Sequence, residues 1–143
     1  MFDEPVRNVM QASKFLKAAP ETLISKAAEL MADKNVGAIM VVESGRLVGI
    51  FTERDLVSRV VARGLDARAT RLADVMTRAP LTVDSHKPFG YALLLMQQNG
   101  FRHLPVVQNG KLIGIVSSRS AMDPELEEFT FEANRRKLFD KIP

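Results

Sequence analysis

The feature that most constrains the fold of this sequence is an internal repeat with an offset of 65 positions. With Gly49 placed against Gly114, Val36–Asp55 lies over Phe101–Ser120 without a gap. The same offset aligns apolar residues of ISKAAELMADK with those of FGYALLLMQQN. Identities kept in one register across two kinds of element indicate two copies of one structural unit. Two units of this size bury their helices and sheets by packing on each other.

Each copy predicts the same order of elements, from apolar periodicity and from the position of its glycine turn. The first copy predicts a short strand near Phe15–Ala18, a helix over Ile24–Met31, strands Ala38–Val42 and Leu47–Phe51, and a helix with an apolar stripe of Leu56, Val57, Val60 and Val61. The second copy predicts a short strand near Leu81–Val83, a helix over Phe89–Met96, and strands Leu104–Val107 and Leu112–Val116. Asn109-Gly110 is a strong signal for the second hairpin turn.

The repeat divides the chain into three parts. Residues 1–64 form the first repeat, 65–122 a polar connector and the second repeat, and 123–143 a tail. Asp123 and Pro124 suit the start of a helix, with acids following and basic residues near its end. This tail helix is either solvated, or it uses Leu126, Phe129 and Ala133 to cover the module or a second chain.

Composition excludes several classes of function. The 143 residues carry a net charge of +3, 46% hydrophobic and 26% charged residues, and no cysteine. Disulfides, thiolate metal sites and cysteine nucleophiles are therefore excluded, and a reducing compartment is favoured. No segment approaches the roughly 20 apolar residues that span a membrane. We expect a cytoplasmic protein without membrane contact.

No motif in the sequence assembles catalytic or metal chemistry. The two histidines lack the neighbouring ligands of a zinc site, so no metal is expected. There is no phosphate-binding P-loop, no G-x-S-x-G nucleophile turn and no G-x-G-x-x-G fingerprint. The sequence therefore predicts a protein that is not an enzyme and that requires no cofactor.

The stretch GIFTERD, from Gly49 to Asp55, marks the passage of a strand into a helix. Thr52 and Asp55 have the spacing of a helix capping box, which needs no ligand. The same two side chains could instead bind an oxygen-rich ligand, because a carboxylate in this position accepts both hydroxyls of a ribose. Gly49 allows another backbone segment or a flat ring to approach closely.

The doubled pattern Gly-apolar-apolar-Thr/Ser-x-x-Asp, preceded by HLPVV and a glycine turn, resembles the cystathionine-β-synthase (CBS) domain. The resemblance runs from about Pro5 to Met122, and two copies resemble a complete CBS pair. It implies an α+β fold of two β-α-β-β-α repeats with pseudo-two-fold symmetry and two clefts, followed here by a C-terminal helix. Such modules commonly bind AMP, ADP or ATP, sometimes S-adenosylmethionine or dinucleotides such as NAD, and commonly form disc-shaped homodimers.

The resemblance also implies roles for individual residues. In the first cleft, Thr52 and Asp55 would hold the ribose, and Ile50 and Phe51 would flank the purine. The phosphate end would be lined by Arg102, His103 and Arg119.

The second cleft departs from the pattern. It would use Arg54, Ser117 and Ser120, but Ser120 stands where the motif has aspartate. Losing a charge-assisted hydrogen bond costs about 1.5–3 kcal/mol, which weakens a site roughly tenfold to hundredfold. We expect one competent cleft and one that is weak or empty.

Three functions follow from these patterns. The leading hypothesis is an adenosine-nucleotide-binding regulatory or sensor module that passes its signal to an unidentified partner protein. The second is an interaction scaffold whose clefts have become structural. The third is nucleic-acid binding, suggested by a pI near 9.4 and the basic Arg63–Arg78 stretch. That stretch lacks interleaved aromatic residues and a recognition-helix pattern, so nucleic acid is the least favoured partner.

Overall fold

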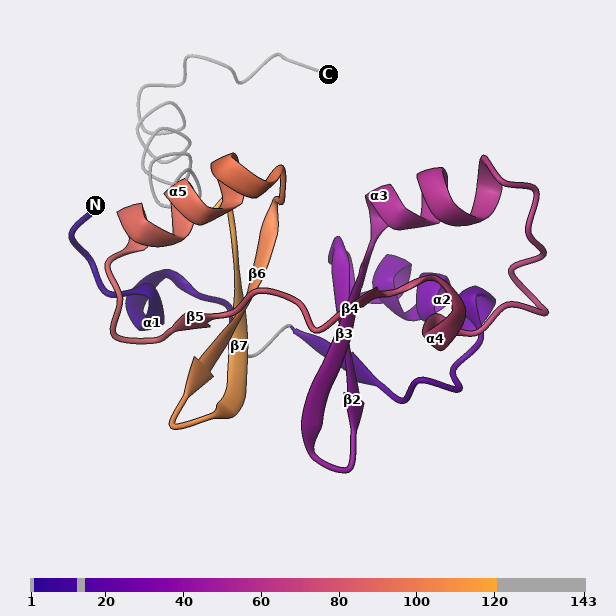
Figure 1. Ribbon diagram of the computed structural model, residues 1–143, viewed down its shortest axis with the longest axis horizontal. Coiled ribbons are helices and arrows are strands. Elements are labelled where there is room, and N and C mark those ends of the chain that lie inside the picture. Colours follow the sequence, from indigo (N-terminus) through magenta and orange to yellow (C-terminus); the bar gives the residue numbers. More distant parts are fainter. Residues whose placement is uncertain (1, 13–14, 121–143) are drawn as a thin grey trace, which may run out of the picture.

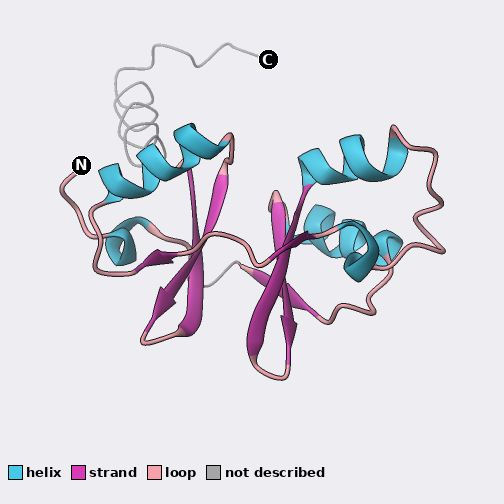
Figure 2. Ribbon diagram, in the orientation of Figure 1, coloured by secondary structure: helices cyan, strands magenta, loops and turns pink. Residues whose placement is uncertain are grey.

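The computed structural model describes residues 2–12 and 15–120 of the chain, which form a mixed α+β structure (Figure 2). The helices are α1 (Val6–Val9), α2 (Ile24–Lys34), α3 (Glu53–Asp55), the π-helix η1 (Leu56–Val61), α4 (Leu72–Val75) and α5 (Phe89–Asn99). The strands are β1 (Leu16–Ala18), β2 (Ala38–Glu43), β3 (Arg46–Thr52), β4 (Thr77–Arg78), β5 (Val83–Asp84), β6 (His103–Gln108) and β7 (Lys111–Ser117).

Two sheets meet at the centre of the molecule and the helices cover their outer faces (Figure 1). One sheet has the strand order β1-β2-β3-β4 and the other β5-β6-β7. Buried Ala38, Met40, Ile50 and Ile115 form an apolar cluster between the sheets. Each sheet has a further apolar cluster on its helix-covered face. The cluster between the sheets is therefore the packing that unites the two repeats.

The two repeats have the same strand pairing. In each, a short first strand pairs in parallel with the first strand of an antiparallel hairpin. The hairpins β2–β3 and β6–β7 even share an irregularity, between Val41 and Val42 in one and between Val106 and Val107 in the other. The predicted β-α-β-β-α order is confirmed in the first repeat and in the second as far as β7. The predicted tail helix lies outside the described residues.

The turn chemistry of both hairpins follows from their sequences. Ser44 and Gly45 have φ values of 51° and 77°, and Asn109 and Gly110 have 52° and 78°. Two consecutive residues with positive φ give the turn whose twist matches that of a β-hairpin. The hairpin predicted at Asn109-Gly110 is confirmed.

The segments that precede the repeats are exchanged between the two halves. Val6 of α1 belongs to the helix-side cluster of the second sheet, and Gln11 pairs with Ile115 of β7. Conversely, Leu72 of α4 is buried in the cluster of the first sheet, and β4 pairs with β3. Each half is therefore completed by a segment that lies next to the other half in the sequence, which ties the halves together.

The helix after β3 buries less of its apolar surface than its sequence predicts. Val60 is buried and Leu56 packs against the core, but Val57 and Val61 are 64% and 69% exposed. The stripe of four residues is thus wrong for two of them. Only one side of η1 faces the core, and Val57 and Val61 lie on the exposed side of the helix.

Candidate functional site

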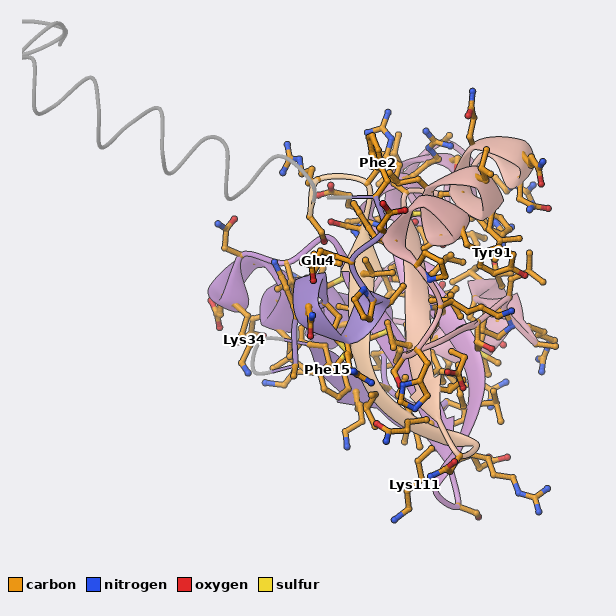
Figure 3. The ribbon with its side chains drawn as sticks, turned by 90° about the vertical axis from the view of Figure 1, so that its left-hand side faces the viewer. Phe2, Glu4, Phe15, Lys34, Tyr91 and Lys111 are labelled. Carbon is orange, nitrogen blue, oxygen red and sulfur yellow. The ribbon has the colours of Figure 1, made fainter. Side chains whose placement is uncertain are left out.

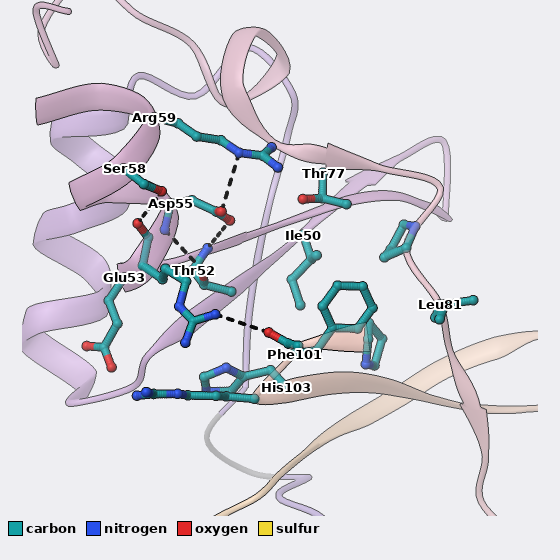
Figure 4. Close-up of a pocket in the computed structure, with 15 residues that line it drawn as sticks. Ile50, Thr52, Glu53, Asp55, Ser58, Arg59, Thr77, Leu81, Phe101 and His103 are labelled. Carbon is teal, nitrogen blue, oxygen red and sulfur yellow. Dashed lines mark hydrogen bonds and ion pairs between the residues drawn. The ribbon is translucent and has the colours of Figure 1, made fainter. Parts of the chain in front are cut away.

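A pocket of about 280 Å³, the first pocket, lies between the two halves (Figure 4). Its polar wall comes from the end of β3, α3 and η1, including Thr52 and Asp55. Its opposite wall comes from the second half, at Phe101, Arg102 and His103. The pocket therefore forms only when both halves are in place.

Asp55 is held in a fixed orientation on the wall of the first pocket. Its Oδ2 accepts the backbone N–H of Thr52 at 2.9 Å, and its own N–H donates to Thr52 Oγ1 at 3.2 Å. Arg59 Nε lies 3.6 Å from Asp55 Oδ1, and the same guanidinium donates to the carbonyl of Val75 at 3.0 Å. The capping box is thus present. Because an ionised carboxylate has about four acceptor sites, these contacts leave capacity for a ligand.

Arg54 connects the two halves across this pocket. Its Nη1 donates to the carbonyl of Gly100 at 3.1 Å, at the end of α5. Gly100 follows the last turn of that helix, with a φ of 71°. A ligand in the first pocket would therefore lie beside a direct polar contact between the repeats.

Five of the residues predicted for the first cleft line the first pocket. These residues are Ile50, Thr52, Asp55, Arg102 and His103. Phe51, expected to flank a purine, is instead fully buried in the cluster on the helix-covered side of the first sheet. Successive side chains of a strand point to opposite faces, so Ile50 and Phe51 cannot both face the same pocket.

A second pocket, of about 310 Å³, lies beside the first. Ser117, Ser118 and Arg119 line it from the end of β7, and Gly37 from the turn before β2. Glu53, Arg102 and His103 line both pockets.

The two motif arginines lie in the pockets opposite to those expected. Arg119 lines the second pocket rather than the phosphate end of the first, and Arg54 lines the first rather than the second. Each arginine comes two residues after the hydroxyl residue of its own motif, so it faces the pocket of its own repeat.

Ser120 does not line the second pocket. It is buried, and its Oγ accepts the backbone N–H of Ser117 at 3.1 Å, which is the bond that Asp55 makes to Thr52 in the first repeat. Ser120 thus keeps the hydrogen bond that caps the turn after β7, but it places no carboxylate in the second pocket.

The pKa of His103 is lowered, which favours its neutral form. Burial is the main cause that lowers its pKa from the ordinary value of 6.5, and the charges of Arg102 and Arg119 lower it further. The carboxylate of Glu53 opposes this shift in part. The positive charge of the shared wall is therefore carried by the arginines.

Sequence reasoning missed several residues of the first pocket. Glu53 and Arg59 line it, and Leu81, Phe101 and Pro105 supply apolar wall. Arg59 follows Asp55 by four positions on a predicted helix, the spacing of a side-chain pair, which was a usable signal. The apolar wall was harder to find because its residues come from segments distant in the sequence.

Neither a metal centre nor a membrane span is found in the described part of the chain. Residues 2–12 and 15–120 contain no group of three or more histidine, aspartate or glutamate side chains that could hold a metal ion. No helix among them is long and apolar enough to cross a bilayer.

Comparison with known proteins identifies the family. The CBS domain model matches residues 6–62 and again residues 72–124. This chain belongs to the CBS domain family. It contains a CBS pair, a type of module that is often regulatory, and no catalytic family is indicated.

Similar proteins differ widely in length. The chain is 34% identical over 143 residues to the meiotically up-regulated gene 70 protein of Schizosaccharomyces pombe, covering 85% of this chain and 20% of that protein. It is 39% identical over 99 residues to the CBS domain-containing protein YhcV of Bacillus subtilis, covering 69% of this chain and 70% of that protein. The chain spans about a fifth of the length of the first curated relatives that it matches.

Solved structures share this fold over most of the chain. A conserved protein from Pyrococcus horikoshii superposes with a TM-score of 0.81 at 28% identity, covering 87% of this chain and 94% of that one. The CBS domain pair of protein MJ0100 superposes with a TM-score of 0.76 at 22% identity, covering 87% of this chain and 98% of that one. That structure is a complex with 5′-methylthioadenosine and S-adenosyl-L-methionine.

Proposed function

We propose that this CBS pair is a regulatory module that binds an adenosine-containing ligand in the first pocket. The observation that carries the proposal is the Asp55 carboxylate, fixed by Thr52 and Arg59 on the wall of a pocket built from both halves. Such a carboxylate suits the two neighbouring hydroxyls of a ribose. The complex of MJ0100 with adenosine compounds supports this ligand class by likeness of fold.

The remaining walls of the pocket suit the other parts of such a ligand. Ile50, Leu81 and Phe101 offer apolar surface to a purine, and Arg102 offers a guanidinium to a phosphate. Neutral His103 provides a hydrogen bond rather than a charge. AMP, ADP and ATP fit this arrangement, and S-adenosylmethionine and NAD belong to the same test panel.

The regulatory effect would come from the contact of one ligand with both repeats. Binding stabilises whichever arrangement of the halves has the higher affinity, and the shift cannot exceed that difference in affinity. The Arg54–Gly100 hydrogen bond joins the halves at the first pocket, so a change in their arrangement on ligand binding would affect it. A partner protein would read the resulting arrangement.

The proposal predicts a specific loss of affinity in Asp55→Asn. Asparagine keeps an oxygen that accepts the Thr52 N–H, but it loses the charge that strengthens ribose hydrogen bonds. The loss of about 1.5–3 kcal/mol corresponds to roughly tenfold to hundredfold weaker binding, measured by calorimetry with the nucleotide panel.

Asp74→Asn is the matched control. Asp74 accepts the backbone N–H of Arg71 at 2.9 Å in a similar turn and pairs with its guanidinium, but it lines neither pocket. This variant should bind like the unmodified protein. Equal affinity in Asp55→Asn and Asp74→Asn would remove Asp55 from the binding site.

A second candidate function is a scaffold without a ligand. The specific observation in its favour is that Thr52 and Asp55 satisfy each other in the capping box. In that case Asp55→Asn changes only the free energy of unfolding, and no member of the nucleotide panel binds. The basic Arg63–Arg78 stretch gives nucleic-acid binding no such support, because Arg71 pairs with Asp74 and Arg78 donates to the carbonyl of Ala73.

We also propose that the module forms a homodimer and acts in the cytoplasm. Exposed apolar residues on η1 and α5 support self-association, namely Val57, Val61, Tyr91 and Leu94; Tyr91 lies on the outside of the molecule in Figure 3. Val61→Glu should shift the protein toward monomer in sedimentation equilibrium, and an unchanged mass would argue against this surface. The cytoplasmic location stays a prediction that rests on the absence of cysteine.

A further inference from the structure

The second pocket offers a different set of polar groups from the first. It keeps the hydroxyl and the arginine of its motif, Ser117 and Arg119, but Ser120 is turned away into the core. Among its lining residues, all in the described part of the chain, the one carboxylate is that of Glu53. No described residue is placed here as Asp55 is placed in the first pocket, so the described wall of the second pocket lacks a carboxylate site for a ribose.

Two arginines line this pocket without a side-chain partner among residues 2–12 and 15–120. Arg102 reaches it from the start of β6, and Arg119 from the turn after β7. Within residues 2–12 and 15–120 neither side chain forms an ion pair or a hydrogen bond, whereas Arg54 and Arg59 of the first pocket each bond to a carbonyl. Two arginines that have no partner in the described part of the chain suit an oxyanion, because each guanidinium can donate paired hydrogen bonds to it.

Gly37 leaves room at the second pocket for the side chains of Glu53, from its own half, and His103, from the other half. A Cβ at this position would lie 3.1 Å from Glu53 Oε1 and 3.2 Å from His103 Nε2. The repeat places Gly37 at the position that Arg102 occupies in the second half. The first half thus has a glycine where the second half has a cation, and the second half contributes both Arg102 and Arg119 to the second pocket.

We propose that the second pocket binds a phosphate-type oxyanion without a ribose, such as free phosphate or pyrophosphate. Arg102 and Arg119 supply the charge, and the hydroxyls of Ser117 and Ser118 supply neutral donors. The ligand differs in class from the nucleoside compound proposed for the first pocket. The inference does not rest on Asp55, although Arg102 lines both pockets.

The surroundings of His103 give this site an additional signature. Burial and the charges of Arg102 and Arg119 lower the pKa of His103, and Glu53 opposes them. A bound oxyanion would offset the two arginine charges and raise the pKa of His103. Binding near pH 6 should therefore take up protons, which calorimetry detects as a heat that depends on the ionisation enthalpy of the buffer.

The test titrates pyrophosphate and inorganic phosphate into the full-length chain by calorimetry. Arg119→Gln should weaken pyrophosphate binding by about tenfold or more, the effect of losing a charge-assisted pair. Glu53→Gln should strengthen it, because it removes a like charge from the wall. Arg46→Gln, a change of the same charge at an exposed hairpin residue that lines neither pocket, is the control and should have no effect.

Two further arms separate this site from the first pocket. In Asp55→Asn, pyrophosphate should bind as in the unmodified protein, and it should still bind when adenosine saturates the first pocket. Failure of pyrophosphate to bind, or equal binding by Arg119→Gln and Arg46→Gln, would overturn the inference. It would also be overturned if only a nucleoside polyphosphate depended on Arg119, because the anion would then be the tail of the ligand in the first pocket.

Discussion

At the scale of single residues, the motif positions serve structure and function together. The capping box at Thr52 and Asp55 is present, and its carboxylate also lines a pocket. The sequence could predict this pair because both residues belong to one local motif. It could not assign Arg54 and Arg119 to their pockets or exclude Phe51, because those outcomes depend on strand faces and on how the halves pack.

His103 gives a residue-scale prediction of pH dependence. Its folded pKa is lowered from 6.5, mainly by burial, so the unfolded chain binds a proton more readily than the folded protein. The neutral histidine contributes its full share of stability above pH 6.5, and this share is lost as the pH falls through the folded pKa.

The free energy of unfolding of the unmodified protein should therefore decrease below pH 6.5 more steeply than that of His103→Gln. Urea denaturation of both proteins between pH 7.5 and about 5 measures the difference, since the slope with pH reports bound protons. Parallel curves for the two proteins would show that His103 keeps an ordinary pKa.

At the scale of elements, the fold depends on close crossings between strands and the exchanged segments. A Cβ at Gly114 of β7 would lie 2.8 Å from the carbonyl oxygen of Gln11, and a Cβ at Gly49 of β3 would overlap the side chain of Met76. The sequence left open whether Gly49 makes room for a backbone or for a flat ring. Both motif glycines make room for the segment that follows α1 or α4.

Gly114→Ala should be strongly destabilising for this reason. The nearest atom belongs to backbone, which cannot move aside as a side-chain end can, and overpacking of this kind costs about 1–3 kcal/mol. Gly49→Ala should cost less, because the overlapping Sδ of Met76 belongs to a flexible side chain. Denaturation midpoints of the two variants test the order, and a Gly114→Ala protein as stable as the unmodified one would contradict the crossing.

The elements themselves were largely predictable. The hairpins, α2 and α5 follow from apolar periodicity and from Asn109-Gly110, since these are local signals. The exposure of Val57 and Val61 could not be predicted, because it depends on which side of η1 packs against the core. The pairing of Gln11 with Ile115 is equally hidden, because the two residues are far apart in the sequence.

At the scale of the whole molecule, the repeat places two similar pockets side by side and the differences between them set the expected ligands. Asp55 equips the first pocket for a ribose, whereas Ser120 leaves the second without that group. Glu53, Arg102 and His103 belong to both walls, so the state of one pocket alters the charges around the other. The exchange of α1 and α4 segments binds the halves into one unit on which a ligand between them can act.

The central claim is that an adenosine compound binds in the first pocket through Asp55. A crystal structure of the protein grown with AMP tests it most directly. We predict one nucleoside per chain, with both ribose hydroxyls within hydrogen-bond distance of Asp55 and the purine against Ile50, Leu81 and Phe101. A nucleoside seated in the second pocket, or a first pocket without AMP at a concentration that saturates any binding seen by calorimetry, would contradict the account.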